Sequence, residues 1–411
     1  MSSSISFPYE SMKSSLIFMA AGLLTTLALH FPSKYHRYFL LPTWLLTAWS
    51  LTSIDNNHTS KGPIGLESYT AMTCIIYMLI LPQILLFQTH SLIPGAVETN
   101  KPAKLSNFIM CPSRSSLSAA FRVWNNPRQL SFRHPGPGSA PWLELLKFAL
   151  YRVFKVGIII IIDRVLVQKG RAYLTAGSTL LDFTADKEPI LRRLVEWDEY
   201  DPVSQHQMIL RAFISVAWIW ANILILESYH AILSVLFVVV LRFDDPEDWP
   251  PLFGGITEAW TVKRFWGKFW HRIATPTFAT WARVVSRRVL KIGTGSEFEK
   301  TVVAFGIFFF SGLAHATSAW RVGQGDAHRD LLFFCANFVV VGTEILVGGL
   351  VWNAVRKTKY AVLLEDRRLQ VVGKALGYVW VFAWFFWATP RWVYSKTLRW
   401  SLQQVLLQSR A

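Results

Sequence analysis

The chain has 411 residues, of which 52% are hydrophobic and only 17% are charged, and its formal net charge is +16. A soluble domain carries roughly 25% charge, so this composition excludes an ordinary soluble globular protein. The Lys and Arg residues lie mainly between apolar runs and not in one basic domain. That distribution is typical of cytosolic loops beside anionic head groups and argues against a nucleic-acid-binding protein. The three cysteines form neither a disulfide framework nor a metal-ligand spacing, and we expect no metal site.

Three apolar runs near the N-terminus are long enough to cross a bilayer, which takes about 20 residues of helix. They cover residues 15–31, 38–54 and 68–87. Lys13 is the only base before the first run, and no clean small-residue cleavage site is present, so we expect a retained span and not a removed signal peptide. The next segment, 91–141, is rich in Pro, Gly, Ser and Arg and is predicted to be a polar loop.

The middle of the chain holds two less regular candidates. Residues 142–162 are apolar overall, but charged residues make their first half amphipathic, which suits the membrane interface. Residues 208–241 are too long for one ordinary span, and Glu227 and His230 lie within them. One tilted helix and two short broken helices are both compatible with this pattern. Glu227 and His230 share a helix face, and we expect them to pair with each other in preference to lining a tunnel.

Three later apolar runs complete the predicted spans: residues 301–320, 331–352 and 371–394. Backbone groups find no water partners in lipid, so each run is expected to be helical. The predicted fold is therefore an all-α polytopic membrane protein with about eight spans, in a range of seven to nine. We divide it into N-terminal transmembrane helices over residues 1–90, the polar loop 91–141 and a transmembrane core over 142–411.

Two basic loops flank the spans at 301–320 and 331–352. The loop 242–298 carries nine Lys or Arg residues, and the loop 353–370 is also basic. Because two spans separate these loops, both lie on one side of the membrane. The positive-inside rule predicts that this side is cytosolic.

The first chemical constellation is the segment from Arg264 to His271, in which aromatic and basic residues alternate as RFWGKFWH. On a helix, Arg264, Lys268 and His271 would share one side, which suits an anionic ligand. The alternative is an interfacial amphipathic helix with Trp anchors, and periodicity alone favours this alternative. Upstream, the acidic stretch 244–248 is predicted to be a solvated loop and not a metal site.

The second constellation is His315, which follows Ser311 and Gly312 inside an otherwise apolar run. Ionisable residues within a span are costly, and they usually face a cavity or a polar partner. Histidine exchanges protons near neutral pH, and the small residues one turn away leave room for a ligand or a neighbouring helix. These residues alone do not decide between a catalytic base and an interhelical hydrogen bond.

Together the two constellations resemble the membrane-bound O-acyltransferases, in their wax-synthase-like branch, and especially the fungal acetyltransferases that modify terpenoid and meroterpenoid scaffolds. The resemblance is sharpest over residues 241–320. It implies a buried acyl-transfer tunnel, with His315 as the embedded catalytic histidine and His271 as the second polar position. Relatives often carry an acidic residue directly after the embedded histidine, where this chain has Ala316. Any orienting partner of His315 must therefore come from elsewhere. The motif body matches at Arg264, Phe265, Trp266, Gly267 and Trp270.

The resemblance implies transfer of an acetyl group from acetyl-CoA, or of a longer acyl group, to a hydroxyl of a lipophilic alcohol in secondary metabolism. His315 would take the hydroxyl proton, and His271 would orient the donor or bind the oxyanion. We expect no permanently bound cofactor and no nucleic acid. Acyl-CoA, the alcohol and membrane lipid are the expected partners, and the endoplasmic reticulum is the expected location. The residues predicted to bind the acyl-CoA are Lys263, Arg264, Trp266, Lys268 and Arg272.

Other functions compete with this interpretation. A wax synthase would transfer long-chain acyl groups to fatty alcohols by the same chemistry. A transporter would use Glu227, His230 and His315 as a polar pathway, but transporters often contain internal repeats, and neither constellation occurs twice. A non-catalytic membrane scaffold would leave the embedded histidine unexplained. We therefore favour the acetyltransferase interpretation.

Overall fold

The computed structural model describes residues 9–31, 33–54, 66–87, 114–130, 140–196, 202–358 and 366–409. All regular structure in these ranges is helical, which confirms the predicted all-α class. The predicted polar loop 91–141 lies largely outside the described residues, as does Cys111. The α-helices are α1 (Tyr9–His30), α2 (Ser33–Thr52), α3 (Leu66–Pro82), α4 (Arg114–Trp124), α5 (Trp142–Ile162), α6 (Gln168–Leu174), α7 (Ile190–Val195), α8 (Gln205–Ser234), α9 (Val262–Arg264), α10 (Thr275–Val284), α11 (Glu297–Arg321), α12 (His328–Arg356) and α13 (Arg367–Gln408).

Several of these helices continue into a short π-helical turn. The turns Gln83–Phe87, Asp163–Val167, Val235–Val240, Phe265–Phe269 and Val285–Val289 follow α3, α5, α8, α9 and α10. Short 3₁₀ turns lie at Leu180–Phe183, Ala185–Lys187, Pro246–Asp248 and Ile256–Glu258. Two of the long helices, α8 and α11, begin at side-chain caps: Ser204 accepts from the Gln207 amide, and Ser296 accepts from the Glu299 amide, both at 3.1 Å.

Six helices within the described ranges are long and apolar enough to cross a membrane. They are Met12–His30, Glu67–Phe87, Gln205–Val240, Glu297–Arg321, His328–Arg356 and Arg367–Gln408. The predicted runs 38–54 and 142–162 form α2 and α5, but neither is among these six. The chain is thus a polytopic helical membrane protein, and the predicted count of about eight spans is not confirmed.

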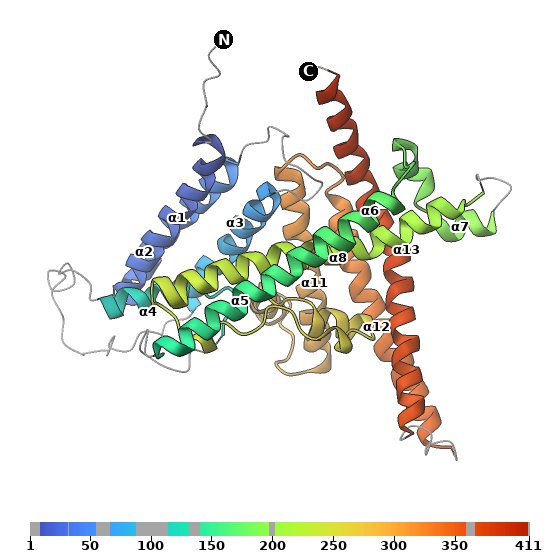
Figure 1. Ribbon diagram of the computed structural model, residues 1–411. Helices are drawn as coiled ribbons and strands as arrows, with labels where there is room; N and C mark the ends of the chain where they lie inside the picture. Colours follow the sequence, from blue (N-terminus) through green and yellow to red (C-terminus); the bar gives the residue numbers. More distant parts are fainter. Residues whose placement is uncertain are drawn as a thin grey trace, which may run out of the picture.

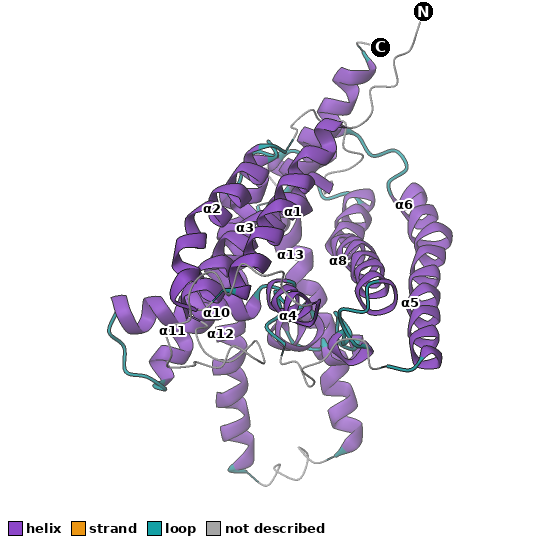
Figure 2. Cartoon of the chain, turned by 90° about the vertical axis from the view of Figure 1, so that its left-hand side faces the viewer, coloured by secondary structure: helices purple, strands orange, loops and turns teal. Residues whose placement is uncertain are grey.

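α8 is continuous through Glu227 and His230, where the sequence allowed either one helix or two broken ones. The Glu227 carboxylate lies 2.8 Å from Nζ of Lys155, and Nδ1 of His230 lies 3.2 Å from Nη1 of Arg152. Both bases belong to α5, which lies alongside α8 (Figures 1 and 2). The expected pairing of Glu227 with His230 is therefore wrong, because each finds its partner on the neighbouring helix. With these groups satisfied, the single long helix needs no break at this point.

Two apolar cores meet at α11. The first combines α1, α3, α4 and α10 with Ala314 of α11, and its buried residues include Ala28, Tyr77, Leu81, Val123 and Phe278. The second combines α8, α12, α13 and the segment after α9, and its buried residues include Trp218, Phe265, Phe333, Phe385 and Trp392. Phe308 of α11 packs against this second core. In Figure 1, α1, α2 and α3 lie together on one side, and α12 and α13 of the second core lie on the other.

α13 contains Pro390, which has no amide hydrogen and so leaves the Phe386 carbonyl without its helical donor. The guanidinium of Arg211 on α8 supplies a donor: its Nε lies 2.8 Å from that carbonyl oxygen. Other nitrogens of Arg211 donate to the carbonyls of Lys187 and Glu188, at 3.1 and 2.8 Å. One buried arginine therefore joins the middle of α13 to α8 and to the turn before α7.

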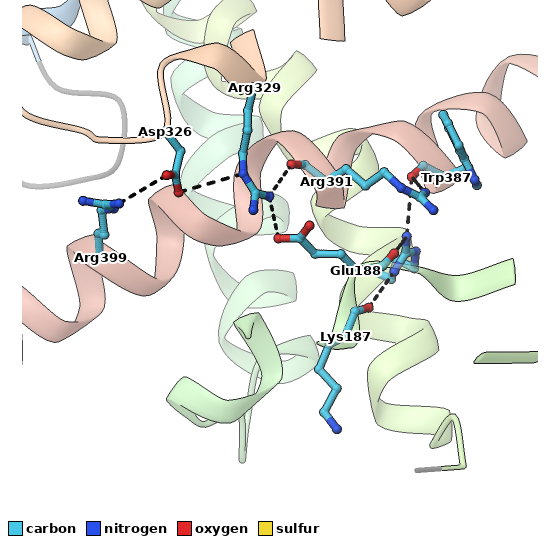
Figure 3. Close-up of polar contacts among 8 residues, drawn as sticks. Lys187, Glu188, Asp326, Arg329, Trp387, Arg391 and Arg399 are labelled. Atoms are coloured by element: carbon cyan, nitrogen blue, oxygen red, sulfur yellow. Dashed lines mark hydrogen bonds and ion pairs between the residues drawn. The ribbon is translucent and has the colours of Figure 1, made fainter. Parts of the chain in front are cut away.

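A chain of charged residues fixes the start of α12 beside the same part of α13 (Figure 3). Arg329 pairs with Glu188 at 2.6 Å and donates to the Arg391 carbonyl at 2.8 Å. Asp326, in the connection between α11 and α12, lies 3.3 Å from Arg399 of α13. These contacts hold the first turn of α12 against α13, which matters for the position of the next residue, Asp330.

Candidate active site

The segment that carries the first motif is attached to α12 and α13 through Glu344. The Glu344 carboxylate accepts the amide hydrogens of Val262 and Lys263, at 2.7 and 2.8 Å. It also accepts from the indole nitrogen of Trp380 at 2.7 Å. A carboxylate at the start of a helix satisfies amides that have no partner within the helix. The position of the motif is therefore set by two membrane helices.

The motif helix ends before His271. The Trp270 amide donates to the Phe265 carbonyl at 2.7 Å, which closes the π-turn, and Trp270 itself is extended. The carbonyl of Phe269, the last residue of this turn, accepts from the Gly254 amide at 2.9 Å and not from a later residue of the helix. Gly254 is required there, because a Cβ atom would collide with the backbone of the motif segment. The loop that contains Gly254 therefore ends the motif helix at Phe269.

Arg264, Lys268 and His271 consequently do not share one side of a helix, and that prediction is wrong. Arg264 instead forms an ion pair with Glu258, and its guanidinium carbon lies 4.6 Å from the ring centroid of Trp260. Nζ of Lys268 lies 3.7 Å from the same Glu258 carboxylate, and its side chain is 59% exposed. Lys268 is therefore open to a ligand, whereas Arg264 is already engaged.

The other three residues predicted to bind acyl-CoA divide in the same way. Lys263 and Arg272 are exposed. Trp266 is partly buried, and its indole nitrogen donates to Oδ1 of Asn337 at 2.9 Å. The Trp384 indole donates to the same oxygen, also at 2.9 Å. Trp266 is thus a packing residue whose indole nitrogen already has a hydrogen-bond partner. The cations on this segment that are exposed to solvent are Lys263, Lys268 and Arg272.

The two histidines lie where the two apolar cores meet. His271 follows Trp270, which belongs to the second core, and precedes Ala274, which belongs to the first. His315 follows Ala314 of the first core and stacks on Phe334 of the second, with ring centroids 4.7 Å apart and an interplanar angle of 18°. His271 and His315 are close enough to interact electrostatically. The two imidazoles, one from the motif segment and one from α11, therefore lie within electrostatic range of each other.

The environment of His271 keeps its ring neutral. Burial, with smaller contributions from His315 and Arg128, lowers the pKa of His271 to about 3. Its ring lies 5.6 Å from that of Phe253, nearly perpendicular to it. Nδ1 is buried and has no hydrogen-bond partner among the residues that the structure describes. A neutral imidazole has one donor and one acceptor nitrogen, so His271 can donate a hydrogen bond to an oxyanion while its ring stays uncharged.

Asp244 and Asp245 of the acidic stretch 244–248 are buried, contrary to the predicted solvated loop, whereas Glu247 is exposed. Asp244 and Asp245 are 5% and 6% exposed. Arg122 of α4 lies 3.2 Å from Asp244 and also pairs with Asp248, while the Trp249 indole donates to Asp244 at 3.0 Å. Burial raises the pKa of Asp244. The stretch is a structural ion-pair cluster that joins the loop to α4.

Sequence reasoning overlooked three polar residues near the histidines. Asn337 lies within a predicted span and Asp330 directly before it, and polar residues at such positions are themselves a signal. Arg128 follows α4 and acts electrostatically on both His271 and Arg272, while donating to the carbonyls of Pro250 and Pro251 at 3.1 Å. No sequence feature marks Arg128, because its neighbours come from distant segments.

Comparison with known proteins identifies the same region. The model of the Membrane bound O-acyl transferase family matches residues 249–336, which include both histidines. The chain is 30% identical over 195 residues to acetyltransferase atnC of an Arthrinium species, covering 47% of this chain and 43% of that protein. It is 28% identical over 203 residues to acetyltransferase ple2 of Rhodocybe pseudopiperita, covering 47% and 48%. It is also 30% identical over 210 residues to acetyltransferase aurG of Calcarisporium arbuscula, covering 51% and 47%.

The matches span about half the length of these relatives, and no solved structure shows a significant match. The resemblance predicted from the two motifs is confirmed, because the matched residues 249–336 contain the segment from Arg264 to His271 and the embedded His315. Over this region the chain is similar to the Membrane bound O-acyl transferase family, and the relatives that it matches include fungal acetyltransferases.

Proposed function

We propose that this chain is an O-acetyltransferase that moves the acetyl group of acetyl-CoA to a hydroxyl of a lipophilic terpenoid or meroterpenoid alcohol. The observation that carries the proposal is the convergence of His271 and His315, from two separate motifs, within a region that matches the acyltransferase family. The names of the relatives support acetyl as the transferred group. The acceptor class rests on the resemblance of the two motifs alone.

The two histidines have complementary tasks in this reaction. The hydroxyl oxygen attacks the thioester carbonyl carbon while its proton passes to His315, which acts as general base. His271, neutral and with a donor nitrogen, hydrogen-bonds the oxyanion that forms. The C–S bond then breaks, and the CoA thiolate takes the proton from His315. The products are the acetate ester and free CoA, and both histidines return to their neutral state.

The acyl donor would reach this site from the side of the basic loop. Lys263, Lys268 and Arg272 are exposed cations on the motif segment and are suited to the CoA phosphates. Arg128 adds a fourth positive charge near Arg272. Aromatic side chains around both histidines exclude water, which limits thioester hydrolysis. We place the protein in the endoplasmic reticulum membrane, with these cations on the cytosolic face.

The transporter alternative has less support. It requires Glu227 and His230 to be available as steps of a polar pathway, but both are engaged with bases of α5. The wax-synthase alternative differs only in acyl and alcohol length, so the experiment below includes it as a separate arm.

The test uses microsomes that contain the full chain, radiolabelled acetyl-CoA and a panel of terpenoid alcohols. We expect an acetate ester from the wild type, with a loss of about 10²–10⁴-fold in His315→Ala, because a general base contributes that much. His206→Ala is the matched control, since His206 bonds Ser178 at the start of α8, in a segment that neither motif includes. It should retain wild-type activity.

Three results would contradict the proposal. Full activity in His315→Ala would remove His315 from the chemistry. Equal losses in His315→Ala and His206→Ala would indicate a general effect on the fold. Ester formation only from palmitoyl-CoA and fatty alcohols would replace the acetyltransferase with a wax synthase.

A further inference from the structure

Asp330 is a buried carboxylate with one unused oxygen. It lies in the first turn of α12 and is 1% exposed. Its Oδ1 accepts from the Trp392 indole and from Nζ of Lys396, both at 2.7 Å. Its Oδ2 is buried and has no hydrogen-bond partner in the described part of the chain. A buried acceptor without a partner is costly, so this oxygen calls for an explanation.

His315 is the nearby group that a free carboxylate oxygen would serve. On α12, Asp330 and Phe334 lie one turn apart and share a face, and Phe334 is the residue on which His315 stacks. α11 approaches this face closely, since a Cβ on Gly312 would lie 3.0 Å from Cα of Leu331. Asp330 acts electrostatically on His315, and more strongly than Lys396 does.

The position of Asp330 is fixed from several directions. Trp392 and Lys396 hold its Oδ1 from α13. The neighbouring Arg329 is bonded to Glu188 and to the α13 backbone, as Figure 3 shows. A carboxylate held this firmly loses little entropy when it interacts with a charge that appears during a reaction.

Two roles are possible for such a residue. A purely structural role would be to bind Trp392 and Lys396 and to stabilise the start of α12, but that role uses only Oδ1. A role toward His315 also accounts for the free Oδ2 and for the contact of α11 with this face of α12.

We propose that Asp330 is the positioning residue of His315, whose free oxygen stabilises the imidazolium formed when His315 takes a proton. The inference rests on the proposed transferase function. In the reaction described above, the proton moves from the acceptor hydroxyl to His315, and Asp330 remains ionised throughout. Nζ of Lys396 lies 2.7 Å from Oδ1 of Asp330, and this ion pair leaves Oδ2 for His315.

The central test is Asp330→Asn in the full chain, because an amide keeps an oxygen for Trp392 and removes only the charge. We expect kcat for ester formation to fall about tenfold to hundredfold, part of the roughly 10²–10⁴-fold that a general base supplies. The KM for acetyl-CoA should stay within about twofold, because Asp330 does not touch the donor. The matched control is Asp163→Asn, which also removes a buried carboxylate that accepts from an indole, that of Trp220 at 3.0 Å.

A second readout needs no acceptor alcohol. Diethyl pyrocarbonate acylates neutral imidazole, and mass spectrometry of peptides gives the rate at His315 relative to His206 in the same sample. A nearby carboxylate makes an imidazole a better nucleophile, so Asp330→Asn should lower this ratio about threefold or more at pH 8, while Asp163→Asn leaves it unchanged. If the wild type forms no ester, the proposed function fails, yet this ratio still decides whether Asp330 acts on His315.

The possible results separate the two roles. Equal losses of kcat in Asp330→Asn and Asp163→Asn, with an unchanged carbethoxylation ratio, would overturn the proposal. If Asp330→Asn does not fold, Asp330→Glu decides instead, because it keeps the charge. Retention of most of kcat and of the carbethoxylation ratio in Asp330→Glu would support the proposal. A loss of both would show that the exact packing at this position matters and not its charge, and would overturn it.

Discussion

Asn337 joins the motif segment to α13 through a single side chain, and its replacement by leucine has a defined cost. Its Oδ1 accepts the indole hydrogens of Trp266 and Trp384, each at 2.9 Å, and its Nδ2 donates to the Phe333 carbonyl of its own helix at 2.8 Å. The residue is 0% exposed. Asn337→Leu keeps the volume of the side chain but removes the acceptor, so two buried indole hydrogens lose their partner.

Two estimates bound the loss in the free energy of unfolding that Asn337→Leu causes. A buried donor without a partner costs about 1–3 kcal/mol, which gives about 2–6 kcal/mol for both indoles. Interhelical hydrogen bonds in membranes contribute only about 0.6 kcal/mol each on average, which gives about 1 kcal/mol. Both indoles of this pair point into protein and not towards lipid head groups, so no lipid or water oxygen replaces the lost one. We therefore expect a loss of about 2–3 kcal/mol in the free energy of unfolding.

Cys74 provides the assay in a chain with Cys111→Ser and Cys335→Ser, because its thiol is fully buried and reacts with a fluorogenic maleimide only after unfolding. Unfolding of the purified protein in detergent, titrated with SDS, gives the midpoint for each variant. Asn222→Leu is the control, since Asn222 is only partly buried and accepts from a tyrosine hydroxyl at 3.2 Å, with no indole. If Asn337→Leu unfolds at the same SDS concentration as the wild type, the two indole bonds contribute nothing and the reasoning is refuted.

Three further predictions use the same preparation. Arg211→Met should lower the free energy of unfolding by at least about 3 kcal/mol, since it leaves several buried carbonyls without a charged donor; adding Pro390→Ala, which restores a backbone amide, should recover part of this loss. Glu344→Leu should increase tryptic cleavage after Lys263 severalfold in intact membranes, because the start of the motif helix is no longer held. His271→Gln should reduce the dependence of stability on pH. The pKa of this histidine is about 3 in the folded chain against 6.5 as the reference, so the unfolded form takes up a proton first as the pH falls. The wild type should therefore lose about 2 kcal/mol between pH 6.5 and pH 5 that the variant keeps; equal pH dependence in both would contradict this.

The parts of the fold that the sequence predicts are those governed by local periodicity. The runs that begin at residues 301, 331 and 371 form α11, α12 and α13. The continuity of the helix over residues 208–241 could not be predicted, because it depends on the contacts of Lys155 with Glu227 and of Arg152 with His230. These bases come from another helix, and their register against α8 is a tertiary property.

The candidate site divides along the same line. His271 and His315 were identifiable from their motifs, but their proximity depends on how α10 and α11 pack. The end of the motif helix before His271 is determined by Gly254, whose amide takes the Phe269 carbonyl from outside the helix. Helical spacing within the motif carries no information about such a contact, and for that reason it wrongly placed His271 on the same side as Arg264 and Lys268.

One pattern within α12 was visible in the sequence, and its meaning required the structure. Asp330, Asn337 and Glu344 lie seven residues apart, two helical turns each, so that they form a polar stripe along one face. Each accepts an indole hydrogen from α13: in order, the donors are Trp392, Trp384 and Trp380.

This stripe explains why the site is held in place within a membrane. Apolar surfaces do not drive helices together in lipid, so the register of two spans depends on packing and on polar bonds. A slip of α13 by one residue along α12 would break all three indole bonds at once. The same three acceptors also fix what lies beside them: Glu344 holds the start of the motif helix and Asn337 holds Trp266. Asp330, at the end of the stripe, is thereby presented to His315 by the register that positions the motif carrying His271.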